Sequence, residues 1–411
     1  MTLEAPTPPP EAARRRALAL VALATLGGLT VWFSTNAIAT ALGDEFGFGS
    51  GDLAWLTIAV QLGFVAGTLG SAMLNLSERM NPRRLFAIAA LCAALANVAP
   101  LASDRLEVWL AARVLTGVCL GGVYAPALHV ISGWYATGRG YALGVIVGAL
   151  TLGSGSPHLL RAVLVDRWQA SMLAASLLAA AGALVMWALV EDGPYHSMPQ
   201  RVSLGDFWRG VSARGPLLAL GGYLGHMWEL YAMWAWLPVF LVEVYGDREV
   251  PGLGLRVGGL AAFGVFALGA ASAVVAGQLA ERLGRTRVTA AAMLVSGSMA
   301  LVTGFLPESA LVLVALAAGV WGATVVADSA QFSAAMTELA DDRYRGSALA
   351  FQTGLGFLLT TVTIRAVPLI EARAGWGPAF ALLAIGPTLG IASMLALRRL
   401  PEASRMAGGL R

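Results

Sequence analysis

A histidine and a glutamate inside an apolar stretch are the residues of this sequence best suited to carry chemistry. His226 and Glu229 have the spacing of neighbours on one helix face, and Tyr223 flanks them. Counted at 1.5 Å per residue from Arg214, they lie about 18 and 22 Å along a helix, near the middle of a bilayer. A carboxyl group in a low dielectric favours its neutral form, so Glu229 could load and release a proton with His226 as relay or counterion. The alternative is that Glu229 only hydrogen-bonds to a neighbouring helix and fixes the packing.

A second acidic residue, Asp328, lies in another apolar stretch, and Gln331 follows it one turn later. Charged groups inside membrane spans are costly and are therefore candidates for function. We predict either a second proton or solute site here, or a salt bridge or hydrogen bond that closes the inner gate. Other polar and aromatic residues of the apolar stretches are candidates to line a solute path, with helix packing as the alternative: Trp32, Asn36, Gln61 and Tyr124.

Two arginines lie at equivalent positions near the outer ends of two apolar stretches. These are Arg161 and Arg365, and His158 lies one turn deeper than Arg161. Together they could form a positive outer vestibule that attracts anions. The alternative is that each arginine only extends its charged group to the membrane interface.

The elements that must position these residues are membrane-spanning helices. Hydrophobic residues make up 57% and charged residues 12% of the 411 positions, whereas soluble domains have roughly 25% charged residues. We predict an all-α integral membrane protein with twelve transmembrane helices in two pseudo-symmetric six-helix bundles. The apolar stretches long enough to span the hydrocarbon are 17–41, 53–76, 84–102, 107–132, 140–163, 169–190, 215–241, 257–280, 287–306, 309–335, 346–369 and 378–397.

The distribution of arginines predicts the topology. All 27 basic residues are arginine, and most of them fall at span ends on one side, which places both termini in the cytoplasm of an inner (plasma) membrane protein and argues against a nucleic-acid partner. The expected organisation is a cytoplasmic N-terminal tail, a six-helix bundle, a polar cytoplasmic linker, a second six-helix bundle and a cytoplasmic C-terminal tail. Their ranges are 1–16, 17–190, 191–214, 215–397 and 398–411.

An acidic-basic turn occurs twice, with Glu281 lying 203 positions after Glu78. Gly284 and Asn81 supply residues that tolerate positive φ where the chain reverses. The run from Gly277 to Arg285 resembles the loop signature of the major facilitator superfamily, and the earlier copy is a more divergent version of it. The resemblance implies a two-half transporter whose turns latch one helix against the next, whereas the alternative is a pair of ordinary positive-inside loops. The gating residues expected from it are Glu78, Arg79, Arg83, Glu281, Arg282 and Arg285.

Arg113 belongs to a second motif. With Gly117 four residues later it resembles the helix 4 motif of the same family, which implies proton coupling or anion attraction at Arg113. The alternative is an arginine that extends to the outer interface. The region 122–144 also looks like the branch that contains nitrate/nitrite and cyanate porters, although the arginines that nitrate porters carry in helices 2 and 8 are missing.

These features together predict a proton-coupled secondary active transporter of a small anionic solute. It is expected to work by alternating access, as a monomer in the lipid bilayer. One alternative is proton-antiport efflux of amphiphilic drugs or metabolites. Another, of a different class, is a transport-dead membrane sensor or scaffold. The sequence contains no phosphate-binding glycine-lysine loop and no zinc-binding histidine pair, so we expect no enzyme activity, no cofactor and no metal.

Overall fold

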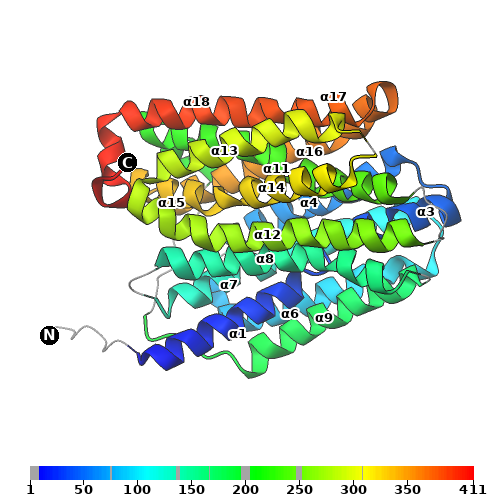
Figure 1. Cartoon of the computed structure of the whole chain (residues 1–411). Helices are drawn as coiled ribbons and strands as arrows, with labels where there is room; N and C mark the ends of the chain where they lie inside the picture. Colours follow the sequence, from blue (N-terminus) through cyan, green and yellow to red (C-terminus); the bar gives the residue numbers. More distant parts are fainter. Residues whose placement is uncertain are drawn as a thin grey trace, which may run out of the picture.

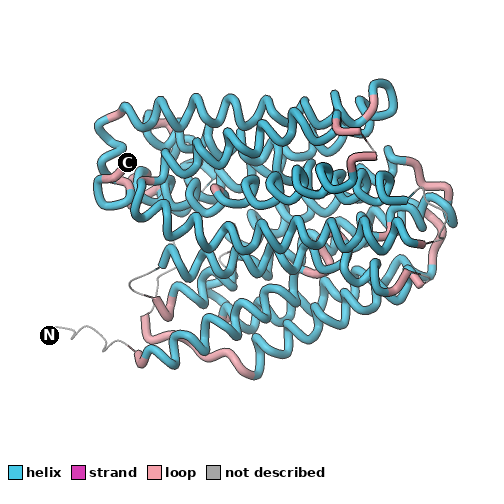
Figure 2. The backbone as a smooth tube through the Cα atoms, in the orientation of Figure 1, coloured by secondary structure: helices cyan, strands magenta, loops and turns pink. Residues whose placement is uncertain are grey.

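The computed structural model describes residues 9–74, 76–135, 139–165, 167–195, 204–246, 252–307 and 309–411, and within these ranges it contains helices and no strand. The long helices run side by side along one axis (Figure 1), and the loops gather at the two ends of the bundle (Figure 2). The first helix begins, and the C-terminal segment ends, at the same end of the bundle, which we call the terminal end. Many leucine and valine side chains remain exposed on the flanks of the bundle, as expected of a surface in contact with lipid.

Eleven helices of the described residues are long and apolar enough to cross a membrane. They confirm the predicted all-helical membrane fold, and their ends agree with the predicted spans to within a few residues. In chain order they are α4 (Ser50–Met73), α6 (Pro82–Val98), α7 (Leu106–Ser132), α8 (Arg139–Val163), α9 (Trp168–Ala188), α11 (Arg214–Gly246), α12 (Leu253–Leu283), α13 (Arg285–Val302), α14 (Leu311–Ala327) continued by α15 (Ser329–Leu339), α16 (Arg345–Ala374) and α17 (Trp376–Ala381) continued by α18 (Ile385–Arg399).

The remaining predicted span, 17–41, is not one continuous helix. It consists of α1 (Glu11–Leu29), α2 (Ser34–Ala37) and α3 (Ala39–Phe46), with a turn at residues 30–33. This turn has the sequence Thr-Val-Trp-Phe, and β-branched and aromatic residues are weaker helix formers than leucine or alanine. The Thr30 hydroxyl donates to the carbonyl of Ala175 on α9 at 2.6 Å, so a contact with another helix holds the break.

Two groups of helices, α1–α9 and α11–α18, form the two halves of the bundle. Across the boundary, α8 packs against α12 and α4 packs against α16. The polar segment predicted as a linker, 191–214, lies between the halves, and its residues 196–203 are outside the described residues. Its described part includes the short helix α10 (Phe207–Val211), which packs on α16.

Four glycines allow α4 and α7 of the first half to pack closely. Gly63 and Gly67 of α4 face Gly117 and Gly121 of α7, and a methyl group at any of these positions would overlap the backbone of the opposite helix. Small residues at such spacing let helix backbones approach closely, which is a main source of stability inside a membrane. The α7 helix that carries Arg113 is fixed in this way.

We therefore expect Gly117→Ala to destabilise the protein by about 1–3 kcal/mol, the usual cost of overpacking. Gly70→Ala in α4 is the matched control, because a methyl group at Gly70 meets no atom within 4 Å. The measurement is the thermal unfolding midpoint of each purified variant in one detergent. Equal midpoints for the two variants would contradict the packing described for α4 and α7.

Candidate functional site

Glu229 lies in the middle of α11 and is 1% exposed. Its carboxylate accepts two hydrogen bonds from other helices: one from the Ser296 hydroxyl of α13 at 2.9 Å and one from the Trp321 indole N–H of α14 at 2.7 Å. Ser296 also donates to the carbonyl of Met293 at 3.3 Å. A buried carboxylate without a cation is costly when ionised, and both oxygen atoms of this one are held by neutral donors.

His226 lies one turn before Glu229 and faces a break in the tenth predicted span. Its Nδ1 atom is 2.9 Å from Oδ1 of Asp328, and its Nε2 atom is 3.0 Å from the Ser329 hydroxyl. The distance to Asp328 is that of a hydrogen bond, but the angles are not, and Asp328 Oδ1 has no hydrogen-bond donor among the described residues. Helix α14 ends before Asp328 and α15 begins at Ser329. The titratable groups therefore meet where the helix is interrupted.

Arg113 forms the corresponding polar network in the first half. Its side chain is completely buried, so it does not extend to the membrane interface as the alternative interpretation proposed. One terminal nitrogen donates to the carbonyls of Val31 and Trp32, in the break between α1 and α2. The other donates to Asn97 Oδ1 at 2.9 Å and to the Ser34 hydroxyl at 3.3 Å. Arg113 thus donates to backbone carbonyls at the break, where the regular helical hydrogen bonds are interrupted.

Aromatic rings from both halves fill the space between these two networks. The central aromatic cluster consists of Trp32, Phe33, Phe64, Tyr231, Trp234, Phe266 and Phe357. Tyr231 connects its two sides, with ring centroids 5.8 Å from Trp32 and 5.4 Å from Trp234. The Phe64 and Phe357 rings, from opposite halves, lie 4.5 Å apart. The halves therefore touch at mid-membrane through ring contacts.

The other residues predicted to line the path are distributed around this cluster. Tyr223 packs beside His226, with ring centroids 6.3 Å apart. Asn36 pairs with the Thr57 hydroxyl at 3.0 Å, and Gln61 is fully buried. Tyr124 is half-buried on α7. The structure brings His226, Glu229, Tyr223 and Asp328 together, whereas Arg113 belongs to a separate network.

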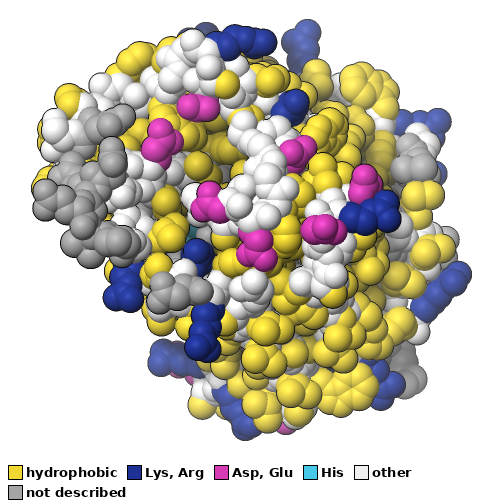
Figure 3. Space-filling view, turned by 90° about the vertical axis from the view of Figure 1, so that its right-hand side faces the viewer, with side chains coloured by type: hydrophobic (Ala, Val, Ile, Leu, Met, Phe, Trp, Pro, Cys, Tyr) yellow, Lys and Arg dark blue, Asp and Glu magenta, His cyan; other side chains and the backbone are white. Residues whose placement is uncertain are grey.

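The predicted outer vestibule lies at the end opposite the termini. His158 is buried and stacks on Phe266 at 5.8 Å. Arg161 donates to the carbonyls of Leu164 and Val165, and the Arg365 guanidinium lies against Gly51. Figure 3 shows acidic side chains around the middle of this end face with basic side chains among and around them, so the face is not the uniformly positive vestibule that was predicted. The acidic residues of the helix ends and loops here are Asp44, Glu45, Asp52, Asp104, Glu107, Glu243 and Glu371.

The two repeated turns lie at the terminal end. In the first, Arg83 pairs with Asp192 at 2.8 Å, just after α9. In the second, a carboxylate oxygen of Glu281 lies against Gly140 at the start of α8, in the other half. Arg79 and Arg282 are exposed, and the side chain of Glu78 is outside the described residues.

Arg285 organises a larger network at the second turn. Its guanidinium forms a bidentate pair with Glu338, at 2.6 and 2.8 Å, and donates to Gln331 at 2.8 Å. Glu338 also accepts from the backbone N–H of Ala407 at 3.2 Å. The stretch predicted as a cytoplasmic tail is therefore folded against the second half, with Ala403 and Met406 of this stretch fully buried.

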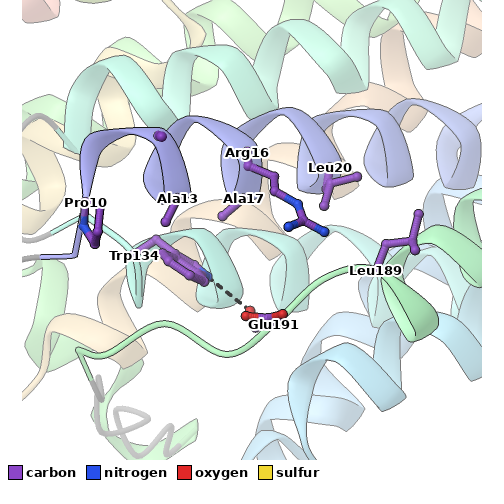
Figure 4. A pocket seen from close by; sticks show the side chains of 9 residues that line it. Pro10, Ala13, Arg16, Ala17, Leu20, Trp134, Leu189 and Glu191 are labelled. Carbon is purple, nitrogen blue, oxygen red and sulfur yellow. Dashed lines mark hydrogen bonds between the residues drawn. The ribbon is translucent and has the colours of Figure 1, made fainter.

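A cavity of about 380 Å³ also opens at the terminal end, in the first half. Figure 4 shows Arg16 of α1 pointing into it, with Glu191 on the opposite side. The Trp134 indole N–H donates to the backbone carbonyl of Glu191 at 3.0 Å, and both residues line the cavity. The residues that line this cavity do not include members of the two buried networks or of the central aromatic cluster.

Sequence reasoning missed several partners of the predicted site residues. Asn97 was hidden because one asparagine in an apolar stretch has no pattern of its own. Ser296 and Trp321 were missed for the same reason, since a serine or tryptophan in a span usually packs. Glu338 gave a usable signal, because it is an acidic residue at the cytoplasmic end of a predicted span, close to a basic turn.

A comparison with protein families gives a match over most of the chain. The sequence profile described as Major Facilitator Superfamily matches residues 20–363. The matched region runs from the first predicted span into α16, so it includes both halves, Arg113, Glu229 and the central aromatic cluster. No curated protein matches the chain.

The Arg113 network makes a prediction about the break in the first span. We expect Arg113→Gln to lower stability by about 1–3 kcal/mol, because carbonyls of the break lose a charged donor while buried. Backbone hydrogen exchange at residues 30–37 should rise as well. Arg105→Gln is the control, because Arg105 precedes the same helix and its pair with Glu107 is exposed. Unchanged exchange at the break would show that Arg113 does not hold it.

The Arg285 network makes a prediction about the C-terminal segment. Glu338→Ala removes the acceptor of both Arg285 and the Ala407 N–H, so segment 401–411 should loosen. Bonds to charged groups contribute about 1.5–3 kcal/mol, which corresponds to a rise in hydrogen exchange at Ala407 of about tenfold or more. Glu402→Ala, an exposed acid of the same segment, should leave the exchange unchanged. If both variants behave alike, Glu338 does not anchor the segment.

Proposed function

The chain belongs to the major facilitator superfamily of secondary transporters, and from that premise we propose that it is a proton-coupled transporter of a small solute. The proposed unit is one chain in the inner membrane, because both halves are present in it. Its halves, 17–190 and 215–397, would rock about the solute site between them. The terminal end would face the cytoplasm, because most arginines lie at the span ends on that side.

The observation that carries the proposal is the setting of Glu229. With an ionised carboxylate, Ser296 and Trp321 both donate to it, as the structure has them. When Glu229 is protonated, its hydroxyl can donate to Ser296, because Ser296 can direct its own proton to the Met293 carbonyl. Trp321 continues to donate to the other oxygen. Both protonation states therefore leave the buried groups with partners, which is what a reversible proton carrier requires.

His226, Asp328 and Ser329 support a route for the proton. The histidine contacts an acid on one ring nitrogen and a hydroxyl on the other, so it can exchange a proton on either side. Helix interruptions inside membranes are favoured places for coupling ions, because the backbone there has unused hydrogen-bonding groups. In our proposal, protonation of the pair His226 and Asp328 favours one arrangement of α14 and α15 against α11.

Contacts between the halves support alternating access. At the terminal end, Glu281 lies against Gly140, and at the opposite end, Arg365 lies against Gly51. The central aromatic cluster joins the halves between these two contacts. Among the described residues, the halves thus touch at both ends and in the middle, as in an occluded intermediate. Breaking the contact at one end while keeping the other would open the site to one side of the membrane.

The solute need not be an anion. The sequence suggested one because of Arg113, Arg161 and Arg365, but the first two donate to protein oxygens, and acidic residues gather at the opposite end. The branch resemblance to nitrate/nitrite and cyanate porters rests on residues 122–144 alone. The second candidate, export of amphiphilic compounds, is favoured by the aromatic side chains of the central aromatic cluster, where the two halves meet. We propose that shape and hydrogen bonding select the solute more than charge.

Proton coupling predicts a pH response that depends on Glu229. Spin labels at exposed positions of the two halves, Arg84 and Arg343, would report the separation at the terminal end in a background without Cys92 and Cys119. In the parent, the distribution of distances should shift between acidic and alkaline pH. Glu229→Gln keeps both hydrogen bonds of the site but cannot release a proton. This variant should therefore remain at the acidic distribution throughout.

Glu107→Gln supplies the control, because Glu107 is exposed and lies away from the site. It should respond to pH like the parent. A full pH response in Glu229→Gln would exclude Glu229 as the coupling group. No pH response in the parent would remove proton coupling itself.

A further inference from the structure

Two members of the central aromatic cluster, and Gln61 on α4, carry buried polar atoms that have no hydrogen-bond partner among the described residues. The indole N–H groups of Trp32 and Trp234 and both amide atoms of Gln61 make no hydrogen bond to any described residue. Trp32, Trp234 and Gln61 are 2%, 1% and 0% exposed, so bulk solvent does not reach these groups. Gln61 precedes Phe64 by three residues on α4, which places it on the helix face that carries the cluster.

Buried groups elsewhere, such as the Gln352 amide, also have no partner among the described residues, but among the tryptophans the feature is confined to this cluster. Each buried or partly buried tryptophan of the described residues outside the cluster donates its indole N–H to a protein oxygen: Trp109, Trp134, Trp168, Trp228, Trp236, Trp321 and Trp376. Three further tryptophans are exposed. Only the two inside the cluster are both buried and unpartnered. Buried polar groups are almost always paired, so a ligand that supplies acceptors would complete this site.

The types of group in the cluster define the ligand. Indole N–H groups only donate, so the ligand must carry hydrogen-bond acceptors, and the Gln61 amide can both donate and accept. The surrounding side chains are rings that contact one another in tilted or T-shaped pairs, so a flat molecule that replaced one ring would keep such contacts with its neighbours. No member of the cluster is charged. Arg113 contacts Trp32, but it donates to the backbone carbonyl of Trp32.

Ring contacts between the halves also connect binding to transport. Trp32 with Tyr231, and Phe64 with Phe357, pair across the boundary. A flat solute can take the place of one ring in such a contact when the halves part, and the rings can meet again when it leaves. Solute and ring would thus compete for the same faces.

We propose that the central aromatic cluster binds the solute, and that the solute is a compact, planar, uncharged molecule with hydrogen-bond acceptors. This inference rests on the proposed function, because it names the solute class of that transporter. Trp32, Trp234 and Gln61 are its hydrogen-bonding residues, and Tyr231 separates the two tryptophans. No member of the cluster is acidic, so the cluster offers a cation no counter-charge.

Matched probes test the shape and the charge separately. Purified full-length protein in nanodiscs is titrated with benzamide and quinolin-2-one, which are planar neutral amides, while thermal stability is recorded. Cyclohexanecarboxamide and decahydroquinolin-2-one keep the amide but are not flat. Benzoate and phenyltrimethylammonium keep the flat ring but carry a charge. We expect the planar neutral amides to bind at least about tenfold more tightly than the other probes.

Variants test the residues. Trp234→Phe keeps the ring but removes the N–H, and Gln61→Leu removes the amide at similar size, so each should weaken binding of the planar amides by about fivefold to tenfold. Without a probe, Gln61→Leu should be more stable than the parent, because it deletes two unpartnered buried atoms. A purely structural glutamine would not combine higher stability with weaker binding. Trp236→Phe is the control on the same helix, because its N–H donates to the Ile364 carbonyl at 3.0 Å; it should bind like the parent.

The proposal is overturned if the saturated or charged probes bind as tightly as the planar neutral amides. It is also overturned if Trp234→Phe and Gln61→Leu bind the planar amides like the parent. The pH response through Glu229 is measured without a probe, so its outcome is separate. A preserved pH response with failed probe binding removes only the solute class, whereas probe binding without a pH response removes the proton coupling.

Discussion

Every polar group inside an apolar bundle needs a partner within the protein, and the rest of this structure depends on that constraint. Among the described spans, two interruptions lie next to buried charged or titratable side chains, and an interruption frees backbone groups. At the first, Arg113 supplies donors for the carbonyls of Val31 and Trp32. At the second, His226 contacts the side chains of Asp328 and Ser329. A buried charged or titratable side chain therefore lies at each of these breaks.

The two halves have the same architecture but opposite buried charge. Among the described residues, the buried arginines, Arg113 and Arg161, belong to the first half, and the buried acids, Glu229 and Asp328, belong to the second. An arginine stays protonated, so the first half has a fixed network. Acids and a histidine can exchange protons, so the second half has a network that can change. In the proposed mechanism, one half acts as a scaffold and the other switches against it.

Much of this arrangement could be predicted from the sequence, but the hydrogen-bond partners of the site residues could not. Hydropathy located the spans, and helical spacing placed His226 and Glu229 together at membrane depth. The break at residues 30–33 was missed because an apolar stretch looks continuous whether or not its helix is. The sequence also could not show that Glu229 meets Ser296 and Trp321, since periodicity defines the buried face of a helix but not which helix it meets. Likewise, Arg113 binds backbone carbonyls, which have no sequence signal.

The polar networks and the central aromatic cluster are satisfied to different extents, and this difference suits a transporter. Both terminal nitrogens of Arg113 and both carboxylate oxygens of Glu229 have partners within their own half, so these networks do not depend on the contact between the halves. Trp32, Trp234 and Gln61 are buried without partners among the described residues, and each such group costs about 1–3 kcal/mol. The contact between the halves is therefore weaker than its ring packing alone would make it. A conformer that is closed but incompletely satisfied can open to either side, and it leaves a solute the hydrogen bonds that the protein does not make with itself.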